Sequence, residues 1–307
     1  MKPTFSAIVV TYNGLADLRK CIQSLDLRRN PAWELLVVDN ASSDGIQDYL
    51  LSLADPAIRF IPLSTNTGFA YANNHGFEQA SGEWIFLLNN DATCGTDTLS
   101  ALEEATSHCP DYCIFACHMI RASDGKVDNL GIQFTRSLRG VQIGAGMDNG
   151  WQECREVFGA SGGAMLLHRS VIEDIGLFDA HFFAYQEDVE FAVRARLAGY
   201  RCLYLPRAIV RHKGGGTSSR RSNLFRYYNQ RNMEVLLRCL PARIIWKYGA
   251  LHLTYIAYQI VKWTAKGDGL NVCRAKIDGL KLAYSSRRHL SPVRISSKAF
   301  DAVLARI

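Results

Sequence analysis

Short apolar runs alternate with amphipathic stretches along the first 90 residues of the chain. Four runs have the length and composition of buried β-strands: 5–13 (FSAIVVTYN), 33–40 (WELLVVDN), 58–63 (IRFIPL) and 84–91 (WIFLLNND). The segments between them place apolar residues at helical spacing and predict helices over 14–25, 43–54 and 68–80. Strands that alternate with helices predict a mostly parallel sheet with helices on both faces, an α/β fold.

The pattern changes after residue 92. Further strands are predicted at 111–120, 162–168 and 201–212, with a Gly-rich polar segment at 121–158. After residue 215 the chain becomes helical and basic. We therefore expect a catalytic domain over 1–215, with halves at 1–92 and 93–215, and a basic helical region over 216–307.

Two predicted helices carry local signals. Ser43 is expected to cap the helix over 43–54, because a serine oxygen can accept a backbone N–H of the first turn. The helix over 187–200 places four apolar residues on one face and has Gly199 where the helix should stop. These apolar residues are Val189, Ala192, Val193 and Leu197.

Polar residues lie at the ends of the first four predicted strands or just after them. These are Thr11-Tyr12-Asn13, Asp39-Asn40, Asn66-Thr67-Gly68 and Asn89-Asn90-Asp91. Each group could simply start a turn. However, the carboxyl ends of parallel strands meet at one edge of a sheet, where ligands bind. Four such groups favour a nucleotide site, in which Tyr12 stacks on a base, Asp39 accepts a hydrogen bond from it, and Asp91 holds a divalent cation.

Several motifs in fixed order carry a family resemblance. They are IVVTYNG, LLVVDNASSDG, NTGFAYANNHG, LLNNDA, GASGGAMLLHRSVIEDIGLFDAHFF, YQEDVEFAVRARLAGY and VRHKGGGTS. Together they resemble the inverting glycosyltransferases of family 2, which have the GT-A fold. The branch that includes bacterial rhamnosyltransferases is the most similar. The resemblance covers roughly residues 5–235.

The resemblance implies roles for individual residues. In the donor site it places Thr11, Tyr12, Asn13, Asp39, Asn66, Gly68, Asn73, Asn89 and Asn90. It implies a Mg²⁺ or Mn²⁺ cofactor held by Asp91, with His212 as a further ligand. Asn89 departs from the family's usual first Asp, which removes one anionic ligand. His212 is alternatively an ordinary surface histidine.

The catalytic base implied by the resemblance is Asp188, with Glu187 beside it. An inverting transferase needs a carboxylate to take the proton of the acceptor hydroxyl. Acidic residues are also common at helix N-termini for the macrodipole alone. A helix N-terminus lowers a carboxylate pKa, so burial and the neighbouring Glu187 would have to raise it.

Acceptor and diphosphate contacts are assigned to four other residues. Gly162 and Gly163 are expected to allow a close approach of the backbone to the acceptor sugar. Arg226 and Arg231 are candidates for binding a diphosphate of the donor or the acceptor. The alternative for both arginines is a solvated helix face.

Charge is distributed unevenly along the chain. Residues 201–307 contain 21 Lys and Arg against four Asp and Glu, a net +17, whereas residues 1–200 carry −11. This excess indicates a polyanionic partner, such as nucleic acid, an anionic membrane or a pyrophosphate-bearing molecule, or else a solvated basic surface. Among the partners, an anionic membrane and a polyprenyl-diphosphate-linked acceptor are expected, and nucleic acid is not. The aromatic, Lys-flanked segment 242–266 is either a helix in a membrane interface or a core helix packed on the catalytic domain.

Nine cysteines and the start of the chain bear on location. An odd number of cysteines without a secretory leader predicts reduced thiols and a cytoplasmic protein, peripheral on the membrane. The spacing of Cys109, Cys113 and Cys117 fits a zinc site poorly.

The sequence thus predicts an enzyme that moves a sugar, rhamnose favoured, from a dTDP- or UDP-sugar donor to a glycan or lipid-linked acceptor in cell-surface polysaccharide synthesis. The alternative is a catalytically weak or non-catalytic protein that binds nucleotide sugars, membranes or nucleic acid. A sugar nucleotidyltransferase is disfavoured because TYNGLADL lacks a Gly-rich basic loop after the first strand.

Overall fold

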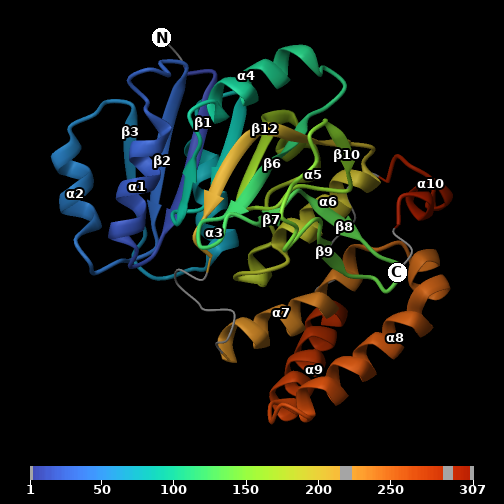
Figure 1. The fold of residues 1–307 in the computed structure, drawn as a ribbon. Coiled ribbons are helices and arrows are strands. Elements are labelled where there is room, and N and C mark those ends of the chain that lie inside the picture. Colours follow the sequence, from blue (N-terminus) through green and yellow to red (C-terminus); the bar gives the residue numbers. More distant parts are fainter. Residues whose placement is uncertain (1–2, 215–222, 286–292, 305–307) are drawn as a thin grey trace.

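The computed structural model describes residues 3–214, 223–285 and 293–304. A ten-stranded sheet in the order β10-β12-β6-β11-β4-β1-β2-β3 forms the centre of the molecule, with β5 and β7 paired to β12 and β6 (Figure 1). The strands are β1 (Phe5–Thr11), β2 (Trp33–Asp39), β3 (Ile58–Pro62), β4 (Trp84–Leu88), β5 (Ala92–Cys94), β6 (Ile114–Arg121), β7 (Val127–Asn129), β8 (Ile132–Phe134), β9 (Gly140–Gln142), β10 (Arg155–Val157), β11 (Ala164–His168) and β12 (Cys202–His212).

Helices cover both faces of this sheet, as the alternating pattern predicts. They are α1 (Leu15–Leu25), α2 (Ile46–Leu53), α3 (Phe69–Gln79), α4 (Thr98–His108), α5 (Arg169–Ile175), α6 (Glu187–Leu197), α7 (Asn223–Val235), α8 (Ala242–Thr264), α9 (Gly269–Ser285) and α10 (Ser297–Ala302). Successive β1 residues point to opposite faces. Val9 belongs to an apolar cluster with residues of α1, α2 and α4, whereas Ile8 belongs to a second cluster with residues of α3, α5 and α6.

Strand direction changes in the second half of the chain. The strands β3, β2, β1 and β4 are mutually parallel, but β11 is antiparallel to both β4 and β6. Strand β12 then runs parallel to β6 and antiparallel to β5. This arrangement brings the end of β12 back to the residues that follow β4.

Helix α6 is buried on nearly all sides rather than on one face. The predicted apolar face is confirmed, and Gly199, at φ +92°, follows the helix. Glu190 and Arg194 on the other side are also buried and form an ion pair at 2.8 Å. The prediction for Ser43 is wrong, because Gly45, at φ +87°, is the N-cap of α2. The Ser43 backbone N–H donates instead to Asn13.

The C-terminal helices α7, α8 and α9 pack together beside the β8–β9 hairpin (Figure 1). Their contact with α6 and the hairpin forms a separate apolar cluster that includes Phe134, Val193, Leu236 and Ile244. The domain boundary predicted near residue 215 lies outside the described residues. Within the ranges that the structure describes, every helix is too short or too polar to cross a bilayer.

Candidate functional site

The ends of β1, β2 and β4 form one polar edge of the sheet. Thr11 lies opposite Asp39 in the β1–β2 register, and both are buried. The Asn90 side-chain amide donates to Thr11 Oγ1 at 3.1 Å. The structure therefore confirms that these predicted strand ends meet at one edge.

Asp39 and Asn13 organise the loops that follow β1 and β2. Both Asp39 oxygens accept from the Ser42 backbone N–H, at 3.2 and 3.3 Å. Asn13 is in the left-handed region at φ +48° and accepts from the Ser43 N–H at 2.9 Å. Its own N–H donates to Ser42 Oγ at 2.9 Å. These bonds tie the two loops together and fix the backbone on both sides of Tyr12, whose side chain is half-buried.

The loop before α3 is held by the buried Asn40. Its Oδ1 accepts from the Thr67 N–H at 2.8 Å, and its Nδ2 donates to the Gly68 carbonyl at 3.2 Å. Asn66 is exposed and accepts from the Gly68 N–H at 3.1 Å. The loop thus lies at the same edge of the sheet as Asp39, and the Asn66 side chain is exposed to solvent there.

Gly68 also allows a close contact with the second half of the domain. It has φ +84°, and a Cβ atom there would lie 2.5 Å from the Phe183 ring and from the Phe183 carbonyl oxygen. The Ala70 N–H donates to that carbonyl at 3.2 Å. A glycine is required here for both reasons.

Asp91 and His212 form the second part of the site. Strand β12 pairs with β5 so that His212 lies opposite Ala92, and His212 Nε2 lies 3.1 Å from Asp91 Oδ1. On its other side, His212 Nδ1 lies 2.7 Å from Asp128 Oδ2. Burial alone would lower the pKa of His212, but the hydrogen bonds and charges of Asp128 and Asp91 raise it to about 9. Without a bound cation, these two carboxylates therefore favour the protonated imidazole, and a metal ion on Nε2 would replace that proton.

This donor set fits a divalent cation. A carboxylate oxygen, an imidazole nitrogen and the side-chain amide of Asn89, 3.3 Å from His212 Nε2, lie together. Asp128 on the far ring nitrogen is the partner that metal-binding histidines usually have. The described residues include no cluster of three or more His, Cys, Asp or Glu placed to hold a metal alone. Cations of this kind are commonly completed by substrate phosphates, so a small protein donor set suffices.

Gly162 and Gly163 connect the two parts of the site. The Gly163 carbonyl accepts from the Asn89 N–H at 3.0 Å, next to Asp91. The Gly162 N–H donates to Asp188 Oδ2 at 3.0 Å. Two consecutive residues thus place the cation ligands and the predicted base at the same end of the sheet.

Asp188 and Glu187 begin α6 in different surroundings. Asp188 accepts from the backbone N–H groups of Gly162 and Val189, the second at 2.8 Å. Glu187 is 6% exposed, and its Oε2 has no hydrogen-bond partner among the described residues. Burial and the neighbouring Asp188 charge raise the pKa of Glu187 to about 8. Glu187 is therefore protonated at neutral pH.

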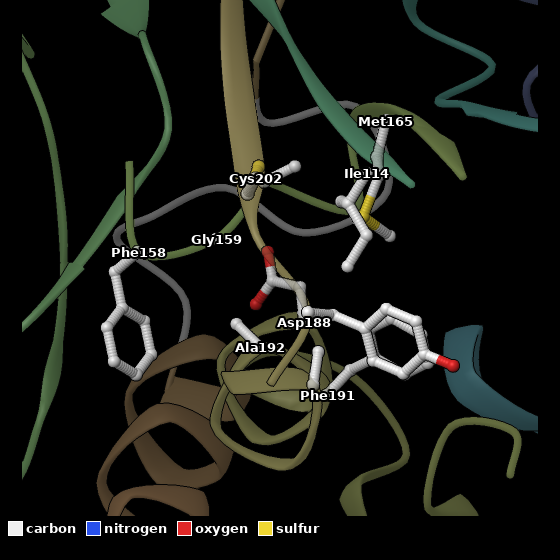
Figure 2. Close-up of a pocket in the computed structure, with 11 residues that line it drawn as sticks. Ile114, Phe158, Gly159, Met165, Asp188, Phe191, Ala192 and Cys202 are labelled. Carbon is white, nitrogen blue, oxygen red and sulfur yellow. The ribbon is translucent and has the colours of Figure 1, made fainter. Parts of the chain in front are cut away.

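Burial also raises the pKa of Asp188 above its ordinary value, although its backbone hydrogen bonds oppose this shift. Figure 2 shows the reason, since the Asp188 carboxylate lies among apolar side chains. The narrow pocket around it is lined by Phe158, Met165, Phe191, Ala192 and Cys202, among others. The sequence left open whether the helix N-terminus or burial would dominate, and burial does.

The loop before Glu187 is strained and is held by α7. Phe183, Tyr185 and Gln186 all have positive φ, at 58°, 70° and 70°. The fully buried Asn232 donates to the carbonyls of Phe182, Ala184 and Tyr185, at 2.9, 2.8 and 2.6 Å. Asn232 therefore compensates a backbone that non-glycine residues rarely adopt.

Three of the predicted site residues use their side chains in contacts with other parts of the protein. Asn73 is buried in α3 and donates to the Phe69 carbonyl at 2.8 Å. Arg226 pairs with Asp268 and lies over the Trp263 ring. Arg231 donates to the His181 and Phe182 carbonyls. These contacts suit structural roles, so diphosphate binding by Arg226 and Arg231 stays a prediction.

Two residues of the site escaped the sequence analysis. Asp128 lies in the Gly-rich polar segment 121–158, and only the pairing of β7 with β6 brings it near His212. Asn232 lies in the same RYYNQRN segment that drew attention to the arginines. The sequence did contain an indication for Asn232, because an Asn within an apolar helical pattern is expected to be buried and then needs hydrogen-bond partners.

Comparison with known proteins agrees with this geometry. The family model described as Glycosyl transferase family 2 matches residues 6–176. The chain is 28% identical over 243 residues to N-acetylglucosaminyl-diphospho-decaprenol L-rhamnosyltransferase of Mycobacterium tuberculosis, covering 71% of this chain and 78% of that protein. It is 29% identical over 126 residues to a putative teichuronic acid biosynthesis glycosyltransferase of Bacillus subtilis, covering 40% and 50%.

Solved structures share the fold. GalNAc-T7 with UDP, GalNAc and Mn²⁺ superimposes with a TM-score of 0.65 at 14% identity, over 93% of this chain and 56% of that one. A mannosyltransferase from Pyrobaculum calidifontis in complex with GDP-Man and Mn²⁺ gives 0.55 at 17% identity, over 93% and 87%. The sheet order and these likenesses show the GT-A fold, and the matched family model shows that the chain belongs to family 2 of the inverting glycosyltransferases.

Proposed function

We propose that this glycosyltransferase transfers a sugar, with rhamnose favoured, from a dTDP- or UDP-sugar to a lipid-linked saccharide in cell-surface polysaccharide synthesis. The observation that carries the proposal is the pair Gly162 and Gly163, which bind Asp188 on one side and Asn89 on the other. A carboxylate for the acceptor and a cation site for the diphosphate are thereby adjacent. The rhamnosyltransferase relative supports the choice of donor and acceptor.

Asp188 acts as the base in this proposal. It accepts the proton of the acceptor hydroxyl while the hydroxyl oxygen forms a bond to the anomeric carbon. The bond from that carbon to the diphosphate oxygen breaks, and its electron pair leaves with the nucleoside diphosphate. Glu187, protonated at neutral pH, adds no second negative charge beside the base.

Asp91, His212 and Asn89 would hold Mg²⁺ or Mn²⁺ in this reaction. The cation supplies electrostatic stabilisation of the charge on the leaving diphosphate. Thr11, Tyr12, Asn13 and Asp39 would contact the base and ribose, and Asn66 and Gly68 the diphosphate side of the pocket. Asn90 supports Thr11 through its hydrogen bond.

The location follows from the acceptor class. A polyprenyl-diphosphate-linked saccharide is confined to a membrane, so the enzyme would work at the cytoplasmic membrane face. The cytoplasmic location itself stays a prediction of the sequence.

The test is thermal stability against a panel of nucleotide sugars, each with and without Mn²⁺ or Mg²⁺. A ligand that binds the folded state raises the melting temperature of the protein, so the nucleotide sugar that raises it most identifies the donor. We expect a metal-dependent rise with a dTDP- or UDP-sugar, and its loss in Asp91→Ala. Asp148→Ala is the matched control, since Asp148 is exposed and pairs with the surface residue Lys126.

Turnover is then measured with the donor so identified and an N-acetylglucosaminyl-diphospho-prenol as acceptor. Formation of a disaccharide with an inverted anomeric centre would support the whole proposal. A donor shift without turnover on this acceptor would overturn the acceptor class. No shift with any nucleotide sugar would overturn the donor site.

A further inference from the structure

Helix α8 exposes apolar residues and buries polar ones. Trp246, Leu253 and Val261 are 88%, 65% and 69% exposed. His252 and Gln259 on the same helix are buried. An ordinary surface helix has the opposite arrangement, with its apolar stripe on the core.

The exposed residues form one stripe. At 100° per residue, Trp246, Leu253 and Val261 fall within a sector of about 80°. Ala250 and Ala257 lie between them on the same stripe and are also exposed. The stripe is thus a continuous apolar strip along most of the helix.

Polar contacts fix the rotation of the helix. His252 lies 2.9 Å from Glu234 Oε2 and 2.9 Å from the Ser137 carbonyl oxygen, and Glu234 also pairs with the buried Lys276 at 2.6 Å. Gln259 accepts from Gln230 at 3.3 Å. Turning the stripe inward would break this buried network and leave its charges unpaired, which is costly.

Helix α9 repeats the pattern with cations interleaved. Leu270, Ile277 and Tyr284 are exposed at intervals of seven residues, and the exposed Arg274 and Lys281 lie between them. Leu270 and Tyr284 are 90% and 81% exposed. Both helices therefore present apolar side chains with positive charge beside them.

The positive charge around the α8 stripe favours an anionic lipid surface over a second copy of the chain. Helix α8 and the residues to Lys266 contain Arg243, Lys247, Lys262 and Lys266 but no Asp or Glu. Lys262 and Lys266 lie near the Trp263 ring, at 6.0 and 5.2 Å from its centroid. A second copy of the chain would bring like charges together, whereas an anionic lipid surface accepts both the apolar strip and the cations.

We propose that α8 and α9 bind the interface of an anionic membrane through these two stripes, which we call the lipid-facing surface. Trp246 and Tyr258 would lie at headgroup level, where amphipathic aromatic rings are favoured. The sequence analysis left two alternatives for α8, a helix in a membrane interface and a helix packed on the catalytic domain. In this proposal both hold, because one face of α8 packs on the protein and the other binds lipid. The proposal deepens the proposed function, because the enzyme would be held where a lipid-linked acceptor lies.

The test is co-sedimentation of the full chain with vesicles in the absence of substrates. Vesicles of phosphatidylglycerol with phosphatidylcholine are compared with vesicles of phosphatidylcholine alone, at low and high salt. We expect binding to the anionic vesicles, weakened by salt. The double variant Leu253→Glu with Val261→Glu should lose about tenfold or more in vesicle affinity, because two exposed apolar side chains no longer enter the interface.

Leu51→Glu is the matched control, since Leu51 is equally exposed but lies on α2. The melting temperature of the double variant without ligands must be close to that of the wild type, which shows that it folds. Equal vesicle binding by the double variant and the wild type would overturn the proposal. So would a wild-type dimer in light scattering that the double variant abolishes, because the stripe would then bind a second copy. Because vesicle binding is measured without substrates, its failure would overturn the membrane proposal without bearing on the proposed transferase function.

Discussion

The Asn232 amide on α7 donates to the Tyr185 carbonyl at 2.6 Å, three residues before the predicted base Asp188. The same amide reaches the Phe182 and Ala184 carbonyls. A C-terminal helix is thereby bonded to the loop that leads into α6. Both Asp188 and Asn232 lie beyond residue 176, where the matched family model ends, and we infer that Asn232 helps to position Asp188.

Asn232→Ala should therefore impair turnover more than donor binding. The carbonyls of Phe182, Ala184 and Tyr185 lose the Asn232 amide, so we expect a loss of about 1–3 kcal/mol in stability. A displaced carboxylate should lower kcat by up to about 100-fold. The donor KM should change less than kcat, because the loop held by Asn232 meets the predicted donor site only through the contact of Phe183 with Gly68, whereas it leads directly into Asp188. Steady-state kinetics and thermal melting check these expectations.

Gln230→Ala is the matched control for this variant. Gln230 is buried on the same helix but contacts Gln259 of α8 rather than the loop. It should lose stability while keeping kcat. If both variants lose kcat in proportion to their stability, Asn232 is a packing residue and does not position the base.

Asp188→Asn should abolish most of the activity while leaving the fold and the donor site intact. Losing a general base typically costs about 10²–10⁴-fold in rate. Because the base must be ionised and burial raises its pKa, kcat of the wild type should fall on acidification at a pH above the ordinary Asp range. Kinetics of both proteins as a function of pH measure this.

Glu187→Gln is the informative companion, since Gln has the shape of a protonated Glu. At neutral pH Glu187 holds its proton, so this variant should keep most of kcat. A loss as large as that of Asp188→Asn would assign the base to Glu187 instead.

Stability of the protein should also depend on pH through Glu187. Its pKa rises from an ordinary 4.5 to about 8 on folding. Between these values the folded state binds more protons than the unfolded state, so stability falls as pH rises. Glu187→Gln removes this contribution. The melting temperature of Glu187→Gln relative to wild type should therefore increase from pH 4.5 to 8, and a difference independent of pH would contradict the assignment.

Most of the fold was predictable because the local patterns were strong. The runs at 5–13 and 33–40 are rich in apolar residues with polar ends, and they form the parallel pair β1 and β2. The strand ends at Thr11, Asp39 and Asn90 meet because parallel strands share an edge. Antiparallel insertion of β11 between β4 and β6 depends on pairing of distant segments, which single-strand patterns do not encode.

The site was less predictable where it depends on tertiary contacts. Ser43 looks like an N-cap in sequence, but the competing bond to Asn13 and the left-handed Gly45 move the helix start. Arg226 is basic and near the motifs, yet its partner Asp268 lies 42 residues away. The pKa of Asp188 could not be decided from sequence, because it depends on how deeply α6 is buried.

Asp128→Asn should weaken binding of the cation without removing any of its predicted ligands. Asp128 Oδ2 lies 2.7 Å from His212 Nδ1 and so orients the imidazole that faces Asp91. Loss of such a partner typically lowers metal affinity about 10–100-fold. Titration of Mn²⁺ into the protein with a saturating nucleoside diphosphate, followed by calorimetry, measures the change.

Asp124→Asn provides the control, because Asp124 lies in the turn that leads into β7, the strand of Asp128, but pairs with Arg121 on the surface. It should bind Mn²⁺ as the wild type does. His212→Ala should weaken Mn²⁺ at least as much as Asp128→Asn, since it removes the ligand itself, and the double variant should be no weaker than His212→Ala. Additive losses would mean that Asp128 acts independently of His212, and unchanged affinity in all three would remove both residues from the cation site.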